Sequence, residues 1–447
     1  VWLSNNYSND GITQVERTDF TLNDANPCGA MVRLPDGTPD PNAAPCPNTL
    51  FTIPTQGQGR AIWDIPTGLY DAVASGTTDS GVNAIAPGFK IPSQWKFNIG
   101  GNWTFDLGGL GDGYELAADF IYSKSENSAI TTEDSMVQIG TALDGRPIYR
   151  SVNLLDPDCL VTPANAAVCP ARGQQDYVLR NVSGPDADAK VFSISLSKSH
   201  DIGIDWALAY AFTDSTDVSP MTSSTAGSNF GNVAVSDPNN PTLADSNYVI
   251  PHRFTGRFSF RKEFFGDNYT RFTVFGSANE GMPFSHVYAS SNAFGDSSLT
   301  FRHLLYVPTG PTDPVVNFGP GFDQTAFFEY INSSGLAKYA GSIAPRNAFY
   351  SDWWTKFDVR VEQELPGFGD DHHFAAFVMI ENVGNLINED WGIHREQAFP
   401  RTEETVALTV NTATGQLNYN AFNEPGGQQR SQDASLWEIR FGVRYDF

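Results

Sequence analysis

The sequence predicts an all-β protein: a transmembrane, antiparallel, up-and-down β-barrel with long extracellular loops. Apolar and polar residues alternate in nine segments of about 12 to 16 residues. Ordinary globular strands average about five or six residues, whereas crossing a bilayer takes roughly 9 to 11 tilted residues. The connections between the segments are alternately short and long. No apolar run approaches the roughly 18 residues of a membrane helix, since the longest ones, such as "FAAFVMI" (374–380), cover only seven.

The first four segments carry an apolar face and a polar face, because successive side chains of a strand point to opposite sides. Residues 94–107 place on one face Trp95, Phe97, Ile99, Trp103, Phe105 and Leu107. A weaker match follows at 114–127. In 189–200, serines alternate with Phe192, Ile194 and Leu196. Residues 202–213 align Ile202, Ile204, Trp206, Leu208, Tyr210 and Phe212.

The remaining five segments repeat the pattern with more charge on the polar face. Residues 253–264 set four phenylalanines against Arg253, Arg257, Arg261 and Glu263. Residues 353–365 set apolar side chains against Lys356, Asp358, Arg360, Glu362 and Glu364. Weaker matches lie at 268–283 and 372–387. The last segment, "SLWEIRFGVRYDF" (435–447), alternates aromatic and aliphatic residues with Glu438, Arg440, Arg444 and Asp446.

The connections predict which end of each strand faces outward. Tight turns such as "GGLGDG" and "FGDN" alternate with long excursions at about 128–187, 214–248, 284–351 and 388–434. Outer-membrane barrels join their strands by short periplasmic turns and long extracellular loops. A soluble sandwich has no reason to gather every long loop at one end, and a propeller would show a repeat of about 40 residues, which is not visible.

This orientation divides the chain into two parts. Counting back from the terminal strand makes residues 1–92 an extracellular region, with a possible end of an outward strand at 1–3, and 93–447 the barrel strands and their loops. Nine or ten strands with 92 outer residues in front look truncated, because bacterial single-chain barrels close with an even strand number and both ends periplasmic. We therefore expect the C-terminal part of a larger barrel.

Composition excludes one class of partner and gives the chain a turn-rich character. The formal charge of −24 repels phosphate, so nucleic acid is not an expected partner. Charged residues make up 17% of the chain, below the roughly 25% typical of soluble domains. Aromatic residues make up 13%, and the 40 glycines and 28 prolines suit strands joined by many turns.

Four cysteines predict two loops closed by disulfides. Cys28 and Cys46 lie in one irregular stretch, and Cys159 and Cys169 in another. Three pairings are possible, of which the two local ones are the simplest, and oxidised pairs imply an oxidising compartment. A four-thiolate zinc site is the alternative, although neither pair has the close spacing of zinc ligands.

Together these stretches resemble the C-terminal half of a TonB-dependent outer-membrane receptor of the Oar-like branch. The resemblance lies in "APGFKIPSQWKFNIGGNWTF" (86–105), "NYVIPHRFTGRFSFRKEFF" (247–265), "IENVGNLINEDWG" (380–392) and the terminal "WEIRFGVRYDF". It covers about 80% of the chain, chiefly the strands, and rests on the order and spacing of the stretches.

The resemblance implies a 22-stranded barrel in the outer membrane of a Gram-negative bacterium, plugged by an N-terminal domain that this chain lacks. It implies ligand capture by the extracellular loops and import energised by a TonB-type inner-membrane partner. Other implied partners are outer-membrane lipid, the plug, the missing upstream strands, an unknown extracellular ligand and the barrel-assembly machinery, for which Phe447 would be the signal.

The polar face supplies the candidate lumen residues: Arg253, Arg257, Arg261, Arg360, Glu362, Glu438, Arg440 and Arg444. They either grip a movable plug or form a hydrated wall whose charges pair across strands. The candidate membrane-facing aromatics are Trp95, Trp103, Trp206, Phe258 and Phe441. Acidic loop residues are weak calcium candidates, with surface solvation as the competing interpretation: Asp156, Asp158, Asp186 and Asp188.

Three functional hypotheses remain. The first is the import receptor. The second is an Oar-like surface, adhesion or protein-export barrel without nutrient uptake, in which the outer loops do the work. The third, an outer-membrane enzyme, lacks support because no G-x-S-x-G, Walker or G-x-G-x-x-G motif is present, so no enzyme and no cofactor are expected.

Overall fold

The computed structural model describes residues 81–447 except 155, 173–174, 185, 297–300, 369–371 and 447, together with two short strands near the start of the chain. The described residues are mostly β-strand with few helices, as predicted. No helix among them is long and apolar enough to cross a membrane. The predicted residues Cys28, Cys46 and Phe447, and the possible strand at 1–3, lie outside the described part.

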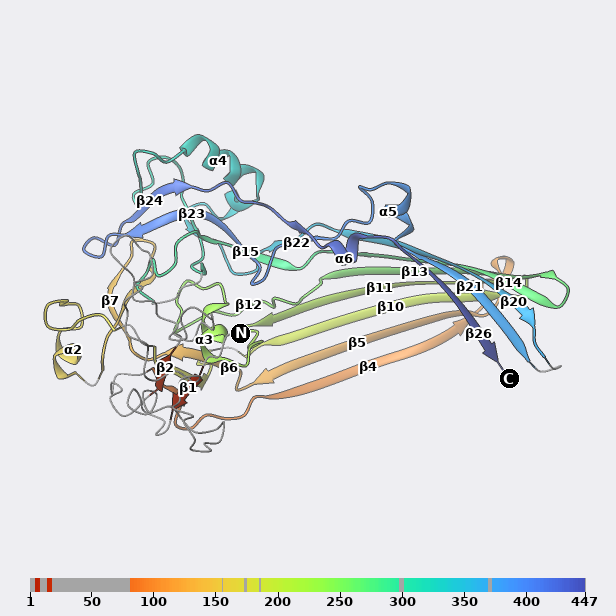
Figure 1. The fold of residues 1–447 in the computed structure, drawn as a ribbon, viewed down its shortest axis with the longest axis horizontal. Helices are drawn as coiled ribbons and strands as arrows, with labels where there is room; N and C mark the ends of the chain where they lie inside the picture. Colours follow the sequence, from red (N-terminus) through yellow and green to blue (C-terminus); the bar gives the residue numbers. More distant parts are fainter. Residues whose placement is uncertain are drawn as a thin grey trace, which may run out of the picture. The chain divides into compact units, whose positions relative to one another are not determined.

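Nine long strands form one antiparallel sheet in which each strand pairs with its neighbours in sequence (Figure 1). They are β4 (Ser93–Phe105), β5 (Tyr114–Glu126), β10 (Asp188–His200), β11 (Ile204–Asp217), β13 (His252–Phe265), β14 (Asn268–Asn279), β20 (Trp354–Pro366), β21 (His373–Glu381) and β26 (Glu438–Asp446). A short strand, β12 (Ala244–Asp245), pairs with β11. Each of the nine predicted segments overlaps one of these strands over most of its length.

Several predicted strand ends differ from the observed ones, most clearly after β21. Residues 383–387 form helix α5 (Val383–Ile387) and do not continue β21. The cause is Asn382, which takes a left-handed conformation (φ 51°) and turns the chain out of the sheet. β14 ends at Asn279, and Ile202 belongs to the turn before β11.

The sheet is open in the described part of the chain. β4 and β26 are its two edges, and these two strands do not pair with each other. The sheet is therefore an up-and-down meander, and the described strands do not close it into a barrel.

Short turns join the strands at one end of the sheet, which we call the turn end. They comprise 106–113, which includes the 3-10 helix η1 (Gly108–Leu110), and 201–203 and 266–267. β20 and β21 are joined at the same end, with 369–371 outside the described residues. Gly203 has φ 83°, and a Cβ there would lie 2.0 Å from the carbonyl oxygen of Arg261. Only glycine fits this tight turn, because it alone adopts such a conformation without steric cost.

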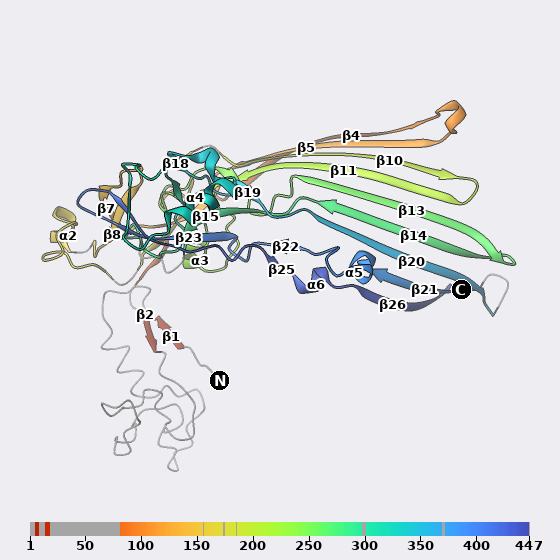
Figure 2. The same cartoon turned by 90° about the horizontal axis from the view of Figure 1, so that it is seen from above.

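The opposite, loop end carries the four long connections, 127–187, 218–251, 280–353 and 382–437. The last two build a folded unit, here called the loop domain (Figure 2). Its five-stranded sheet has the order β17-β24-β23-β15-β19. Its elements are β15 (Pro283–Tyr288), β17 (Val316–Phe318), β19 (Phe349–Tyr350), β23 (Thr402–Val410), β24 (Leu417–Phe422) and helix α4 (Gln324–Ser333).

The loop domain has its own apolar core. Tyr288, Phe327 and Tyr419 are fully buried in it, and Ala142 and Ile148 of the first long connection join the same cluster. Asp323 caps α4 by accepting a hydrogen bond from the amide of Ala326 at 3.0 Å, as short acidic residues do at helix starts. The described parts of the last two long connections are thus folded structure, which their irregular sequence did not predict.

The remaining described elements are short. The strands are β1 (Asn5–Ser8), β2 (Gln14–Arg17), β3 (Asn83–Ile85), β6 (Ala129–Glu133), β7 (Met136–Thr141), β8 (Pro147–Ser151), β9 (Tyr177–Asn181), β16 (Tyr306–Val307), β18 (Ser342–Ile343), β22 (Arg395–Glu396) and β25 (Gln429–Arg430). The helices are α2 (Pro157–Val161), α3 (Ala226–Gly231), η2 (Leu336–Tyr339) and α6 (Gln432–Ser435). β1 pairs with β2 in an antiparallel register.

The chain divides into two compact units, and the sheet and the loop domain belong to the larger one. The smaller unit comprises Val1–Ala84, Glu133–Val137 and Ser151–Val178. Among its described residues, Cys159 and Cys169 are disulfide-bonded and lie in a small buried cluster with Val152. This confirms one of the two predicted local pairings.

The core of the loop domain predicts a large effect of one substitution. Phe327→Ala should reduce the free energy of unfolding of the loop domain by about 3–5 kcal/mol, because it leaves a cavity among aromatic neighbours. Hydrogen exchange of β23 and β24 measures this loss. Glu329→Ala, on the exposed side of α4, should leave the exchange unchanged, and equal effects of the two variants would contradict the core assignment.

Candidate functional site: a sheet with two unlike faces

The apolar side chains of the nine strands lie on one face of the sheet. Residues directly opposite each other in an antiparallel pair share a face. Trp206 lies opposite Phe258, and Phe258 opposite Val274. The same pairing continues across the sheet and also puts on this face the other predicted aromatics, Trp95, Trp103 and Phe441.

This apolar face is not covered by any other part of the described chain. Trp95 is 71% exposed, Phe441 77% and Phe258 46%. Monomeric soluble proteins rarely leave a contiguous apolar area of this kind in water. The face therefore requires an apolar environment.

The opposite, polar face holds all eight predicted charged residues: Arg253, Arg257, Arg261, Arg360, Glu362, Glu438, Arg440 and Arg444. On β26, Arg440 lies 3.0 Å from Glu381 of the neighbouring strand and 2.9 Å from Glu438. Arg360 pairs with Glu362 along β20. The pairing of charges thus accounts for the polar face of β20 and β26.

The arginines of β13 are different. Within the described part of the chain, no carboxylate lies within 4.0 Å of Arg253, Arg257 or Arg261, and all three are exposed. Arg261 lies directly opposite Arg271 of β14, so like charges face each other there. The three arginines of β13 therefore form no ion pair with a described carboxylate, although Arg261 lies over the Tyr269 ring and Arg271 lies opposite Glu362.

Aromatic residues gather on the apolar face at the loop end. The rings of Tyr210 and Phe254 are in tilted contact with centroids 4.8 Å apart, and the Tyr210 hydroxyl lies 2.8 Å from Nδ1 of His252. Trp353 adds its ring 6.2 Å from Phe254. Rings with a polar handle are typical of the membrane–water interface.

A lysine at the turn end also combines apolar and polar contacts. The ammonium group of Lys198 lies 4.4 Å from the ring centre of Tyr114 and donates a hydrogen bond to the carbonyl oxygen of Asp112. The alkyl stem of Lys198 thus lies on the apolar face while its charge reaches the turn. Long cationic side chains at the edge of an apolar layer adopt this arrangement.

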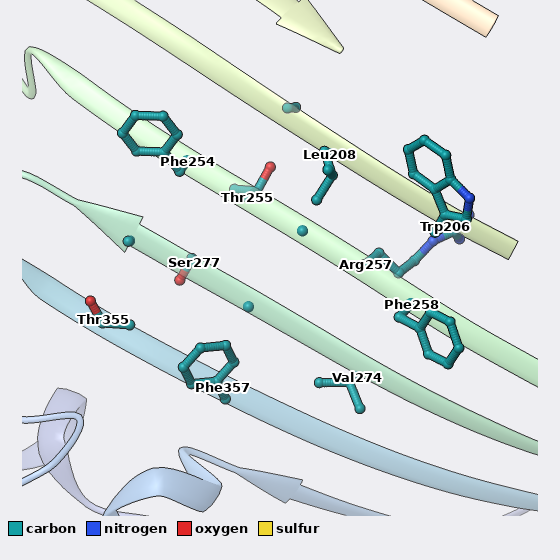
Figure 3. A pocket seen from close by; sticks show the side chains of 14 residues that line it. Trp206, Leu208, Phe254, Thr255, Arg257, Phe258, Val274, Ser277, Thr355 and Phe357 are labelled. Atoms are coloured by element: carbon teal, nitrogen blue, oxygen red, sulfur yellow. The ribbon is translucent and has the colours of Figure 1, made fainter. Parts of the chain in front are cut away.

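A hollow interrupts the apolar face across β11, β13, β14 and β20 (Figure 3). Its volume is about 590 Å³. Its walls are formed by Trp206, Leu208, Phe254, Phe258, Val274 and Phe357, and its floor by Gly256, Gly276 and Ala278. The alternating pattern alone did not predict this hollow, although the two glycines in the strand pattern were its signal.

Two of the calcium candidates take part in local hydrogen bonds. In the described ranges, no three His, Cys, Asp or Glu residues are grouped as metal ligands. Asp156 caps helix α2 by accepting a hydrogen bond from the amide of Asp158 at 2.9 Å. Asp188 lies 3.3 Å from Lys190 and accepts a hydrogen bond from Thr216. Asp156 and Asp188 therefore have structural roles.

The loop domain contains buried polar groups that the sequence did not single out. Tyr330 donates a hydrogen bond of 3.0 Å to Glu403, and Nδ1 of His286 lies 3.5 Å from the same carboxylate. Burial lowers the pKa of His286 to about 3 and raises that of Glu403 above its usual value. A second cluster joins Asp296 to Arg302 at 2.6 Å and to His303 at 3.2 Å.

A polar recess of about 390 Å³ opens on the loop domain, and Glu403 of the first of these two groups forms part of its lining. Glu403, Glu404 and Glu424 line it, and the ring of Phe399, which is 61% exposed, forms part of its wall. Burial raises the pKa of Glu404 as well as that of Glu403. The recess combines carboxylates with an aromatic surface.

The buried His286 predicts that acid weakens the loop domain. Its folded pKa lies below the unfolded value of about 6.5, so the unfolded chain takes up a proton first. Its contribution to stability is complete above pH 6.5 and is lost as the pH falls toward 3. Between pH 6.5 and 5 the loss should be about 2 kcal/mol. Hydrogen exchange of β15 at these two pH values measures it.

The matched variant is His286→Gln, which cannot titrate in this range. Glu403 is present in both proteins, and its raised pKa acts in the opposite direction, so the difference between the two pH dependences isolates His286. An identical pH dependence in both proteins would contradict the assignment.

Comparison with known proteins does not identify a family. No family model matches the chain, and no curated protein sequence matches it either.

Proposed function

We propose that this chain forms part of the wall of an outer-membrane β-barrel and belongs to a TonB-dependent receptor that imports a ligand. The observation that carries the proposal is the register, which aligns the apolar residues of nine strands on one uncovered face. In a bilayer that face contacts acyl chains, while the charged face lines a wet interior.

The shape of the sheet supports the membrane assignment. Its strands have 9 to 14 residues, enough to cross a bilayer with a tilt. Its turns are short at one end, and its connections are long at the other. An open sheet edge is not tolerated in lipid, so the proposal requires further strands to pair with β4 and β26.

The loop domain is the proposed site of ligand capture. It has a core of its own and presents the recess lined by Glu403, Glu404 and Phe399. The arginines of β13, which form no ion pair among the described residues, are the proposed contact for an acidic plug, whereas Arg360 and Arg440 are already paired within the wall.

A surface, adhesion or export role is the second candidate. It is favoured by the size and independent core of the loop domain, since an adhesive protein needs a stable outer structure and no path through the wall. The two candidates share the membrane assignment and differ in whether a nutrient enters the cell.

The membrane assignment predicts opposite environments for two adjacent residues of β11. A nitroxide attached in Leu208→Cys should collide with oxygen and be shielded from a water-soluble nickel complex, because this side chain lies on the apolar face. The matched variant is Ala209→Cys, on the polar face, where oxygen exposure should be lower. Electron paramagnetic resonance of the protein in bilayers measures both. Nickel access at position 208 equal to that of free solution would disprove the assignment.

The import proposal predicts a nutritional defect. A deletion strain should grow poorly on at least one single nutrient source, and uptake of that nutrient should return with the intact gene. Dissipating the energy of the inner membrane should abolish the restored uptake. Normal uptake of every nutrient, combined with defective surface assembly, would overturn import and favour the second candidate.

A further inference from the structure

The hollow in the apolar face has a floor of two glycines and an alanine, where the rest of the face carries larger side chains. Gly256 of β13 lies directly opposite Gly276 of β14, near the middle of the sheet. Phe254 and Phe258 flank Gly256 along its own strand, and Trp206 and Phe357 stand on neighbouring strands (Figure 3). The result is a recess of about 590 Å³ with an aromatic rim.

The backbone does not require these glycines. Neither residue has a positive φ, so other residues fit the same conformation. A Cβ at Gly276 would lie 2.8 Å from the Phe357 ring. The close packing of Phe357 is therefore the reason for a glycine at this position. At Gly256 the nearest atom is Cδ2 of Leu208 at 3.2 Å, the end of a flexible side chain. Gly256 weakens its strand without a local reason, which is typical of a site that a ligand approaches closely.

The chemistry of the hollow selects a hydrocarbon. Thr355 carries the only hydroxyl among the side chains that line it on this face. Thr255, Arg257 and Ser277 contribute backbone to the lining, but their side chains point to the polar face, because they alternate with the apolar set. A ligand with hydrogen-bonding groups would leave them without partners here.

A polar anchor lies at the right distance along the strand. His252 precedes Gly256 by four residues on the same face, which corresponds to about 13 Å in an extended strand. It lies 2.8 Å from the Tyr210 hydroxyl within the aromatic cluster at the loop end. A lipid lying along β13 would therefore place its chain in the hollow and its ester groups beside Tyr210 and His252.

We propose that the hollow binds one acyl chain of a bilayer lipid, whose ester region is held by Tyr210 and His252. The proposal rests on the proposed function, because it requires the apolar face to lie in a membrane. It goes beyond general contact with lipid by naming one position at which a chain is held in preference to the rest of the face.

The test is site-resolved photolabelling of the full-length protein. The probe is a phosphatidylethanolamine with a diazirine in one acyl chain, diluted into vesicles of phosphatidylethanolamine and phosphatidylglycerol. Mass spectrometry then locates the label. Peptides covering 254–258 and 274–278 should be labelled several-fold above the apolar-face peptides of β4 and β10.

Two variants fill the hollow independently, so a folding defect in one does not remove the test. Gly256→Leu and Ala278→Leu should each reduce the labelling of these peptides to the level of the other strands. The matched control is Gly101→Leu, which adds the same side chain to the same face of β4 where nothing lies within 4 Å. The control should leave the labelling unchanged.

The remaining outcomes separate the two proposals. Uniform labelling of the apolar face, or labelling that both filling variants leave unchanged, would overturn the lipid site while the membrane assignment stands. Cross-linking of these peptides to another polypeptide in native membranes would replace the lipid by a protein partner. Absence of label from the whole apolar face would instead refute the membrane assignment.

Discussion

The cross-strand register is the constraint on which the rest of the structure depends. A strand has a period of two, so a slip of one residue would move all its side chains to the other face. Trp206, Phe258 and Val274 stay aligned only because the tight turns at the turn end fix where each strand begins. Gly203 illustrates this, because a larger residue there would collide with the backbone of Arg261.

The two faces manage their polar groups in different ways. The charged residues of β20 and β26 form ion pairs, for example Arg360 with Glu362. This part of the polar face is therefore stable without a binding partner. The arginines of β13 are left to water or to an anionic neighbour. In the loop domain, histidine, glutamate and arginine side chains are buried and paired with other polar groups. Such pairing favours one defined packing of the core over alternative packings.

The sequence was informative wherever one strong local rule operated. Alternation located all nine strands, since a strand with two unlike faces has a clear signature. The alternating pattern did not predict the end of β21 before residue 383. The left-handed conformation of Asn382 turns the chain there, and the alternation of apolar and polar residues does not reveal a backbone conformation. The loop domain was invisible because its strands pair across distant segments, and proline- and glycine-rich sequence resembles loop. The hollow needed the register between two strands, which no single segment specifies.

Parallel pairing in the loop domain has a consequence for the order of assembly. The hydroxyl of Thr405 donates to the carbonyl oxygen of Val287, and these residues are 118 positions apart. Contacts between distant residues form slowly, because the intervening chain must first lose its freedom. β15 therefore cannot pair with β23 until the chain between them, which includes the β20–β21 hairpin, has been synthesised. A nascent chain therefore passes through a stage at which β15 has only the two-residue pairing with β19 and still lacks β23. A chaperone that shields extended apolar segments would act at that stage.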